Sequence, residues 1–248
     1  MLAPASVHQA YRTLRTLLGA AVDNGYLGRN PLDGVKPPKK AAKGPIRSLE
    51  VDQVRRLADV IDERFRALVW VGAFCGLRRG EMLALRWENV NMMSRRIDVV
   101  EQMDPSGKAG DVKAPKSQAG RRSITMPSCV VEALAEHAAR ENAREDFVGP
   151  RTGLVFTAAN GGPVDVNNFG ARVWRPAVDA AGLAPLRLHD LRHTCASLAI
   201  STGASVKVIQ SMLGHASAAM TLDTYGHLMP SESEAVADRM DALVRRAI

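Results

Sequence analysis

The feature that most constrains the fold of this 248-residue chain is a change in the spacing of its apolar residues. Through most of the chain they recur every three or four positions, as on one face of a helix. Between residues 96 and 126 they alternate instead, at Ile97 and Val99 and again at Ile124 and Met126, with a Pro-Ser-Gly turn signal between. The pattern predicts a mostly α-helical fold with one small antiparallel β-sheet (an α+β class) around residues 96–126.

The helical periodicity places segments on both sides of this sheet. On the helix expected at 128–145, His137 falls on the polar face, so we expect it to be solvated. Helices are expected at 6–24, 50–61, 64–75, 128–145, 165–181, 187–201, 205–213 and 231–246.

Turn residues and charge divide the chain. Gly25 and Gly28 end the first helix, and Asn30-Pro31 marks a turn. Residues 31–47 contain prolines, glycines and basic residues, which do not form a regular helix. From Ser48 a longer apolar periodicity begins. We expect a helical segment at 1–30, a basic linker at 31–47 and the main domain at 48–248.

The charge is concentrated near the N-terminus. The chain carries a formal net charge of +7, and residues 1–47 hold eight Lys and Arg against only Asp23 and Asp33. A basic, extended segment is typical of a surface that contacts phosphate backbones, although a solvated linker has the same composition. The residues we expect to contact DNA are Lys36, Lys39, Lys40, Lys43, Arg121 and Arg122.

Several function classes lack support in the sequence. There is no GxxxxGK[ST] or GxGxxG loop, so no nucleotide cofactor is expected, and no CxxC or HExxH motif for a metal. His189 and His193 lie one helical turn apart, but no third ligand accompanies them. The longest apolar run, Ala67 to Leu77, is 11 residues, too short to span a bilayer. Three cysteines among apolar neighbours and no signal peptide favour a cytoplasmic chain without a membrane partner.

The segment Leu188-His-Asp-Leu-Arg-His-Thr-Cys has the clearest chemical pattern. On a helix, His189 and Arg192 share one face, while Leu191 and Cys195 belong to a separate apolar stripe. A cationic pair opposite a core stripe predicts an exposed anion-binding surface. A solvated helix face is the alternative for this segment taken alone.

Other chemical groups follow predicted helix ends. Gly76 and Gly214 each end an apolar helix, where a glycine readily adopts the left-handed conformation. Arg78 follows the first of them in Cys75-Gly-Leu-Arg-Arg-Gly-Glu-Met. His215 follows the second, and Tyr225 comes ten residues later in Met220-Thr-Leu-Asp-Thr-Tyr.

Taken together, these segments resemble the phage integrase family of tyrosine recombinases over nearly the whole chain. The family pattern is an Arg after Gly-Leu, a Lys in a β-hairpin, His-x-x-Arg, a His in Leu-Gly-His and a nucleophilic Tyr. The resemblance assigns these positions, in chain order, to Arg78, Lys116, His189, Arg192, His215 and Tyr225. Lys113 competes with Lys116, and Arg79 with Arg78, while Glu81 is expected to orient the arginine. Residues 1–30 resemble only the last part of the family's helical core-binding domain.

The resemblance implies a mechanism and partners. The two arginines bind the phosphate, His189 assists as base, Lys116 protonates the leaving 5′ oxygen, and His215 hydrogen-bonds the phosphate. Tyr225 attacks and leaves a 3′-phosphotyrosyl link, which needs neither ATP nor metal. The implied partner is double-stranded DNA, held by a tetramer that forms through the helix at 231–246.

Three other functions remain open at this point. A helix-turn-helix-like spacing at 195–213 also fits a DNA-binding regulator without catalysis. A type IB topoisomerase shares the tyrosine chemistry. A metal-dependent nuclease requires clustered carboxylates, and the sequence shows no such motif.

Overall fold

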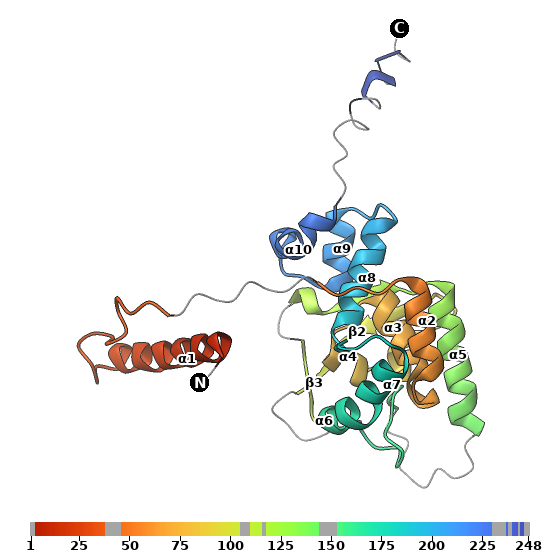
Figure 1. The fold of residues 1–248 in the computed structure, drawn as a ribbon, viewed down its shortest axis with the longest axis horizontal. Helices are drawn as coiled ribbons and strands as arrows, with labels where there is room; N and C mark the ends of the chain where they lie inside the picture. Colours follow the sequence, from red (N-terminus) through yellow and green to blue (C-terminus); the bar gives the residue numbers. More distant parts are fainter. Residues whose placement is uncertain are drawn as a thin grey trace. The chain divides into compact units, whose positions relative to one another are not determined.

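The computed structural model describes residues 3–37, 46–104, 110–115, 118–143 and 153–229, together with 237, 240–242, 244 and 245 (Figure 1). The chain divides into two compact units, Met1–Pro45 and Ile46–Ile248. This division falls within three residues of the predicted linker end at 47. The predicted helix at 231–246 lies mainly outside the described residues.

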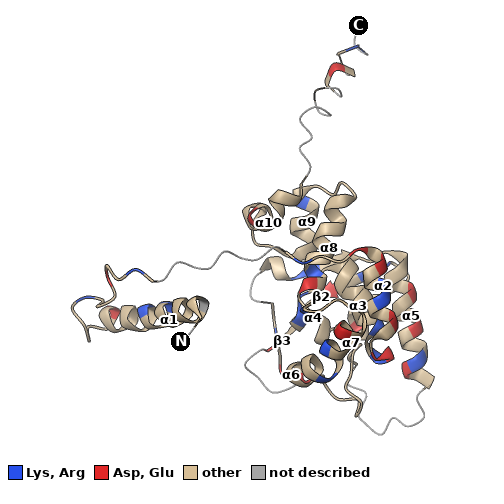
Figure 2. Cartoon of the chain, in the orientation of Figure 1, with Lys and Arg blue, Asp and Glu red and all other residues tan. Residues whose placement is uncertain are grey.

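The first unit is one helix with a returning segment. Helix α1 (Pro4–Asp23) begins with a proline in its first turn, where no amide donor is needed. The Tyr11 hydroxyl donates to the carbonyl of Val35 at 2.9 Å, and Arg15 pairs with Asp33 at 3.1 Å. These contacts hold the returning segment along the helix, whose basic residues are visible in Figure 2. The predicted helix at 6–24 is confirmed and starts two residues earlier.

The second unit is mostly helical. No helix in the described ranges is long and apolar enough to cross a membrane. Its helices are α2 (Val51–Val60), α3 (Arg66–Cys75), α4 (Arg79–Leu83), α5 (Ser128–Ala143), α6 (Val166–Phe169), α7 (Arg175–Ala180), α8 (Asp190–Ser201), α9 (Val206–Leu213) and α10 (Ala218–Tyr225).

Helix α3 forms the centre of this unit and packs between α2, α5 and α8 (Figure 1). Most of its side chains are buried, which explains why it is apolar on all sides. Gly72 lets α8 approach closely, because a Cβ there would lie 2.7 Å from Cδ1 of Leu191. This close packing fixes α8, and with it the His189–Arg192 segment, against the end of α3.

The strands form two small sheets rather than the single one expected. Val90–Asn91 (β1), Arg96–Val99 (β2) and Arg122–Thr125 (β5) form an antiparallel sheet in the order β1-β2-β5, with Ile97 opposite Ile124. Gln102–Met103 (β3) pairs separately with Val112–Lys113 (β4). Between β2 and β3, Glu101 turns its carboxylate to Arg86 at 2.7 Å, and the ladder is interrupted there.

Several predicted helices differ in extent. The segment predicted as one helix at 165–181 is helical without a break from α6 through α7, but its middle turn, Gly170–Trp174, is π-helical, because Pro176 cannot donate its backbone hydrogen bond. Helix α8 begins at Asp190 rather than 187, because the Asp190 carboxylate accepts the Arg187 amide at 2.8 Å and caps the turn. Helices α4 and α10 were not predicted, since both are short and weakly periodic.

The expectation for His137 was wrong. Its side chain is buried, and its Nε2 lies 2.6 Å from the carbonyl oxygen of Val155. The ring packs near Trp87 and Phe156. The polar pattern of its helix is therefore a poor guide at this position, because a neighbouring segment covers it.

Candidate active site

Two helix ends supply the frame of the site. Helices α3 and α9 end at Gly76 and Gly214, both in the left-handed conformation with φ of 64° and 62°. Each turn leaves carbonyl oxygens at the carboxyl end of its helix, where the helix dipole favours positive charge. A Cβ on Gly214 would lie 2.8 Å from the Ala119 carbonyl oxygen, so a larger residue would push away the segment between β4 and β5.

Arg192 connects these two helix ends. Its Nη1 donates to the carbonyl of Gly76 at 2.7 Å, and its Nη2 donates to the carbonyl of Leu213 at 2.6 Å. The residue is only 3% exposed. The expectation that Arg192 lies on an exposed face with His189 was wrong, because helix α9 and the turn after α3 cover it. Its charge therefore acts from within the protein, beneath the surface of the site.

Arg78 and Glu81 form the second part of the frame. Arg78 donates to Glu81 Oε1 at 2.7 Å and to the carbonyl of Gly214 at 2.9 Å, and its side chain is 34% exposed. Burial alone would raise the pKa of Glu81, but hydrogen bonds from Arg122 and Arg78 outweigh it and keep that pKa below its usual value. The ionised carboxylate thus orients Arg78, as expected.

Arg122 belongs to this frame and not to the surface. Its side chain is 5% exposed and pairs with Glu81 Oε2 at 2.9 Å. Its Nε donates to the carbonyl of Met212 at 2.8 Å, and its Nη1 to that of Gly120 at 3.1 Å. The expectation that Arg122 contacts DNA is corrected: its donors are engaged inside the protein, joining β5 to the end of α9. Arg121, the adjacent residue, is exposed.

Tyr225 lies at the end of α10 among histidines. Its hydroxyl is 2.8 Å from Nδ1 of His193, and its ring stacks with that of His215 at a centroid distance of 6.4 Å and an interplanar angle of 8°. His215 is itself held by Thr221, whose Oγ1 lies 2.9 Å from its Nδ1. The ring of His189, the residue before α8, meets that of His193 edge-on at 5.2 Å. The phenol is therefore placed beside His193 and His215 and within electrostatic range of Arg192, and Tyr225 is only 1% exposed.

The electrostatics of the cluster set the protonation states. Burial lowers the pKa of Arg192 to about 9, and nearby arginines add to this effect, yet the group stays cationic at neutral pH. Burial, followed by neighbouring charge, also lowers the pKa of His189 and of His215 to about 4. Burial raises the pKa of Tyr225 to about 12, with Arg192 opposing it. The two histidines are thus neutral at pH 7, and the phenol needs a proton acceptor.

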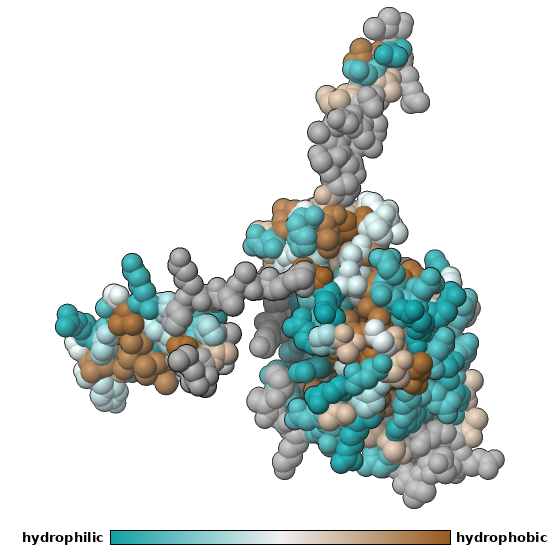
Figure 3. Space-filling model, in the orientation of Figure 1, coloured by the Kyte–Doolittle hydropathy of each residue, from teal (hydrophilic) through white to brown (hydrophobic). Residues whose placement is uncertain are grey.

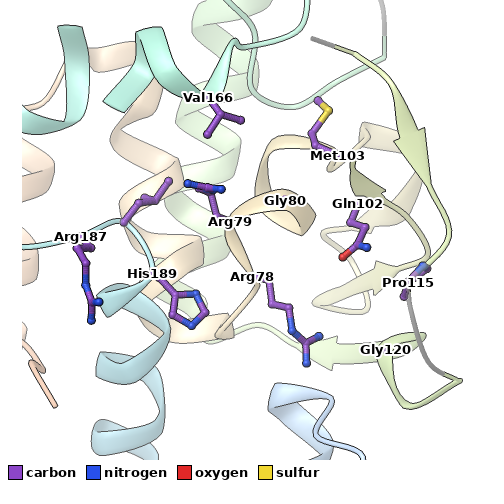
Figure 4. A pocket seen from close by; sticks show the side chains of 11 residues that line it. Arg78, Arg79, Gly80, Gln102, Met103, Pro115, Gly120, Val166, Arg187 and His189 are labelled. Atoms are coloured by element: carbon purple, nitrogen blue, oxygen red, sulfur yellow. The ribbon is translucent and has the colours of Figure 1, made fainter. Parts of the chain in front are cut away.

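A pocket of about 710 Å³ opens over this frame (Figure 4). Arg78, Arg79 and His189 lie around it, and Arg187 stands at its edge. Pro115 and Gly120, from the segment between β4 and β5, also line it. The pocket is therefore open to solvent on the face that presents the guanidinium of Arg78, and an anion entering it meets a concentration of positive charge.

Of the two candidate lysines, Lys116 and Lys113, the structure describes only Lys113. Lys116 lies outside the described residues, between Pro115 and Gln118, which are described. Lys113, on β4, pairs with Asp104 at 2.8 Å. The structure therefore gives Lys113 a structural partner, and the assignment of the lysine stays a prediction. Of the lysines expected to contact DNA, Lys36 is exposed, while Lys39, Lys40 and Lys43 also lie outside the described residues.

Comparison with known proteins decides the family. The model of the phage integrase family matches residues 47–232, three quarters of the chain and all of the cluster described above. The chain belongs to the phage integrase family. The mostly helical fold with small antiparallel sheets, predicted from the sequence, is confirmed as that of tyrosine recombinase catalytic domains.

Individual relatives of this integrase-family chain are a tyrosine recombinase and integrases. It is 25% identical to the XerC-like tyrosine recombinase of Caldanaerobacter subterraneus subsp. tengcongensis, over 93% of this chain and 64% of the relative. It is 27% identical to an integrase of Saccharopolyspora erythraea, over 97% and 67%, and 26% identical to the integrase of mycobacterium phage L5, over 98% and 64%. The chain thus spans about two thirds of the length of the curated relatives it matches.

Solved structures show the same fold. The Tn1549 transposon integrase, in complex with a circular-intermediate DNA, matches with a TM-score of 0.77 and 20% identity, over 98% of this chain and 80% of that one. The XerA recombinase matches with a TM-score of 0.58 and 24% identity, over 95% and 75%. At these identities the likeness establishes the fold of the integrase-family chain.

Five of the six residues expected to be catalytic are therefore brought together: Arg78, His189, Arg192, His215 and Tyr225. Sequence reasoning missed the place of His193, which it weighed only as a metal ligand with His189. The available signal was its position one turn after His189, on the same side of α8. Among the described residues, no group of three or more His, Cys, Asp or Glu is placed to hold a metal ion.

Proposed function

We propose that this chain is a site-specific recombinase that cuts and rejoins double-stranded DNA through a 3′-phosphotyrosyl intermediate, without metal or ATP. The observation that carries the proposal is the placement of a buried tyrosine beside two histidines, in a cluster whose two arginines are held by helix ends and act electrostatically on these residues. A phenol in such surroundings has the chemical partners that phosphoryl transfer requires.

The chemistry follows from these groups. Attack by the Tyr225 oxygen on phosphorus breaks the bond to the 5′ oxygen and conserves the phosphodiester energy in the new link, so rejoining needs no cofactor. Charge develops on the non-bridging oxygens during attack, and the guanidiniums of Arg78 and Arg192 stabilise it. The neutral imidazole of His215 donates a further hydrogen bond to the same oxygens.

Lys116 protonates the leaving 5′ oxygen in this proposal, with support from the ion pair that already occupies Lys113. On an ordinary suicide substrate, Lys116→Ala should slow cleavage on the order of 10²–10⁴-fold, the range for loss of a general acid. On a substrate whose 5′ bridging oxygen is sulfur, the leaving group needs little protonation, and cleavage should recover. Lys113→Ala is the matched control and should show no sulfur-specific recovery. Recovery of Lys113→Ala alone would move the role to that residue.

Double-stranded DNA at a recombination site is the proposed partner. Exposed Lys36 and Arg121, with Lys39, Lys40 and Lys43 of the linker, supply backbone contacts, and the site pocket supplies the contact at the cut. The structures of the Tn1549 integrase and of a lambda integrase dimer were solved with DNA, which supports this partner. The free thiols of Cys75 and Cys195, both buried, support a cytoplasmic location.

Assembly into a tetramer on DNA is proposed through the segment at 231–246. Figure 3 shows apolar surface over α9 and α10, where Val208, Met220 and Leu222 are 55%, 46% and 46% exposed. We propose that the C-terminal segment of a neighbouring protomer covers this surface. Deleting residues 231–248 should then reduce exchange of strands between two sites far more than a single cleavage. Equal losses in both assays would contradict the proposed docking.

The proposed function is tested by trapping the covalent protein–DNA intermediate. The chain is incubated with nicked suicide DNA carrying candidate sites, in the presence of a chelator and without nucleotide, and covalent complexes are separated under denaturing conditions. A covalent protein–DNA adduct is the expected result. Binding without any adduct would instead indicate a regulator, and cleavage that the chelator abolishes would indicate a metal-dependent nuclease. Relaxation of supercoiled DNA regardless of sequence would indicate a topoisomerase.

A further inference from the structure

The histidine nearest the Tyr225 hydroxyl is not the one that the family pattern marks. His193 Nδ1 lies 2.8 Å from the phenol oxygen, and the two rings are 5.7 Å apart at an angle of 60°. His193 comes from the first turns of α8, while Tyr225 ends α10, 32 positions later. Two separate helices therefore meet at this hydrogen bond, directly at the proposed reacting atom.

We propose that His193 accepts the phenol proton of Tyr225 during cleavage and returns it during rejoining, a role that rests on the proposed function. With its proton on Nε2, the neutral ring presents an unprotonated Nδ1, to which the phenol donates. As the Tyr225 oxygen bonds to phosphorus, its proton moves to Nδ1 and the bond to the 5′ oxygen breaks, with Lys116 protonating that oxygen. Rejoining reverses each transfer.

The positions of His215 and His189 suit roles other than accepting the proton of Tyr225. The ring of His215 lies parallel to that of Tyr225, and its Nδ1 faces Thr221 at 2.9 Å. His189 meets His193 edge-on, so it stands one ring further along the same cluster. His189 therefore either orients His193 or faces the phosphate. We assign the role of the base to His193 instead of His189.

The surroundings of the phenol explain why it needs such a partner. Its ring is 1% exposed, so bulk water has little access to take the proton. Burial also raises the pKa of Tyr225 to about 12, which leaves the phenol protonated at neutral pH. A base in direct contact contributes about 10²–10⁴-fold to proton transfer in enzymes.

The test separates proton transfer from positioning. His193→Asn retains a short polar side chain near the Nδ1 position, yet its amide does not take a proton at neutral pH. His227→Asn, at an exposed histidine on the turn after α10, is the matched control. Single-turnover cleavage of suicide DNA is measured for each variant with Tyr225 and again with difluorotyrosine at position 225, whose phenol ionises more readily.

We expect His193→Asn to cleave on the order of 10²-fold more slowly or worse, with unchanged DNA affinity. Difluorotyrosine should recover most of that loss, while the His227→Asn control cleaves like wild type. Wild-type rates in His193→Asn, or a loss that difluorotyrosine leaves unchanged, would overturn the role as base. If His193→Asn melts early, His193→Ala with added imidazole replaces it: recovery supports the role and no recovery overturns it. Absence of adduct in the wild-type chain would instead reject the proposed function.

Discussion

Tyr225→Phe is expected to abolish covalent adducts with suicide DNA while leaving DNA affinity nearly unchanged. The substitution keeps the buried ring and its stacking on His215, and removes only the hydroxyl that lies 2.8 Å from His193. Without that oxygen no phosphotyrosyl bond can form, so the loss should be complete within detection. Adduct yield on a denaturing gel and DNA affinity by fluorescence anisotropy measure the two effects.

The matched control for this substitution is Tyr26→Phe. Tyr26 is 82% exposed in the first unit and should be dispensable for cleavage. Circular dichroism melting curves establish that both variants fold. Adducts that persist in Tyr225→Phe would refute the assignment of the nucleophile, whatever the control shows.

Arg192→Lys is expected to slow cleavage on the order of 10²–10³-fold, the size of losing one donor to a developing oxyanion. Lysine keeps the charge but loses the planar fork that joins the carbonyls of Gly76 and Leu213 at 2.7 and 2.6 Å. The ammonium reaches at most one of these positions well, so the ends of α3 and α9 lose their common partner. Single-turnover cleavage at saturating protein measures the effect.

This substitution should also lower stability, since a buried acceptor left without its donor costs roughly 1–3 kcal/mol. The free energy of unfolding therefore needs to be measured alongside cleavage, and cleavage assayed well below the melting temperature. Arg96→Lys, at an exposed position on β2, is the control. Cleavage by folded Arg192→Lys at the wild-type rate would show that the guanidinium does not act on the transition state.

Much of the fold follows from local pattern. Helices α3, α5 and α9 were predicted because their apolar residues repeat with helical spacing, and the glycines after α3 and α9 mark their ends. The continuous helix predicted at 165–181 is present, but its π-helical turn at Gly170–Trp174 was not expected, because the spacing of apolar residues does not show how the chain adjusts around Pro176. Helix α10 carries little periodic signal and is held by its cap at Ser217 and by burial of Tyr225.

Most residues of the site were predicted from the sequence, but how deeply they are buried was not. The resemblance to the family pattern indicated which residues belong together, yet the burial of Arg192 and Arg122 depends on segments more than 20 positions away. Helical spacing placed Arg192 on a polar face, because a one-dimensional pattern does not include the helix ends that cover it. The contact of His193 with Tyr225 likewise depends on how α8 and α10 meet, a long-range property that sequence spacing does not contain.

The central claim, that Tyr225 becomes covalently joined to DNA, is tested most directly by mapping the adduct. Suicide DNA is cleaved in the presence of a chelator, the complex is digested with trypsin and nuclease, and peptides that carry nucleotide are identified by mass spectrometry. The tryptic peptide 208–239 contains Tyr225 as its single tyrosine. The account predicts a nucleotide joined through its 3′ phosphate to Tyr225 in this peptide. A nucleotide on Tyr11 or Tyr26, or cleaved DNA without any modified peptide, would contradict it.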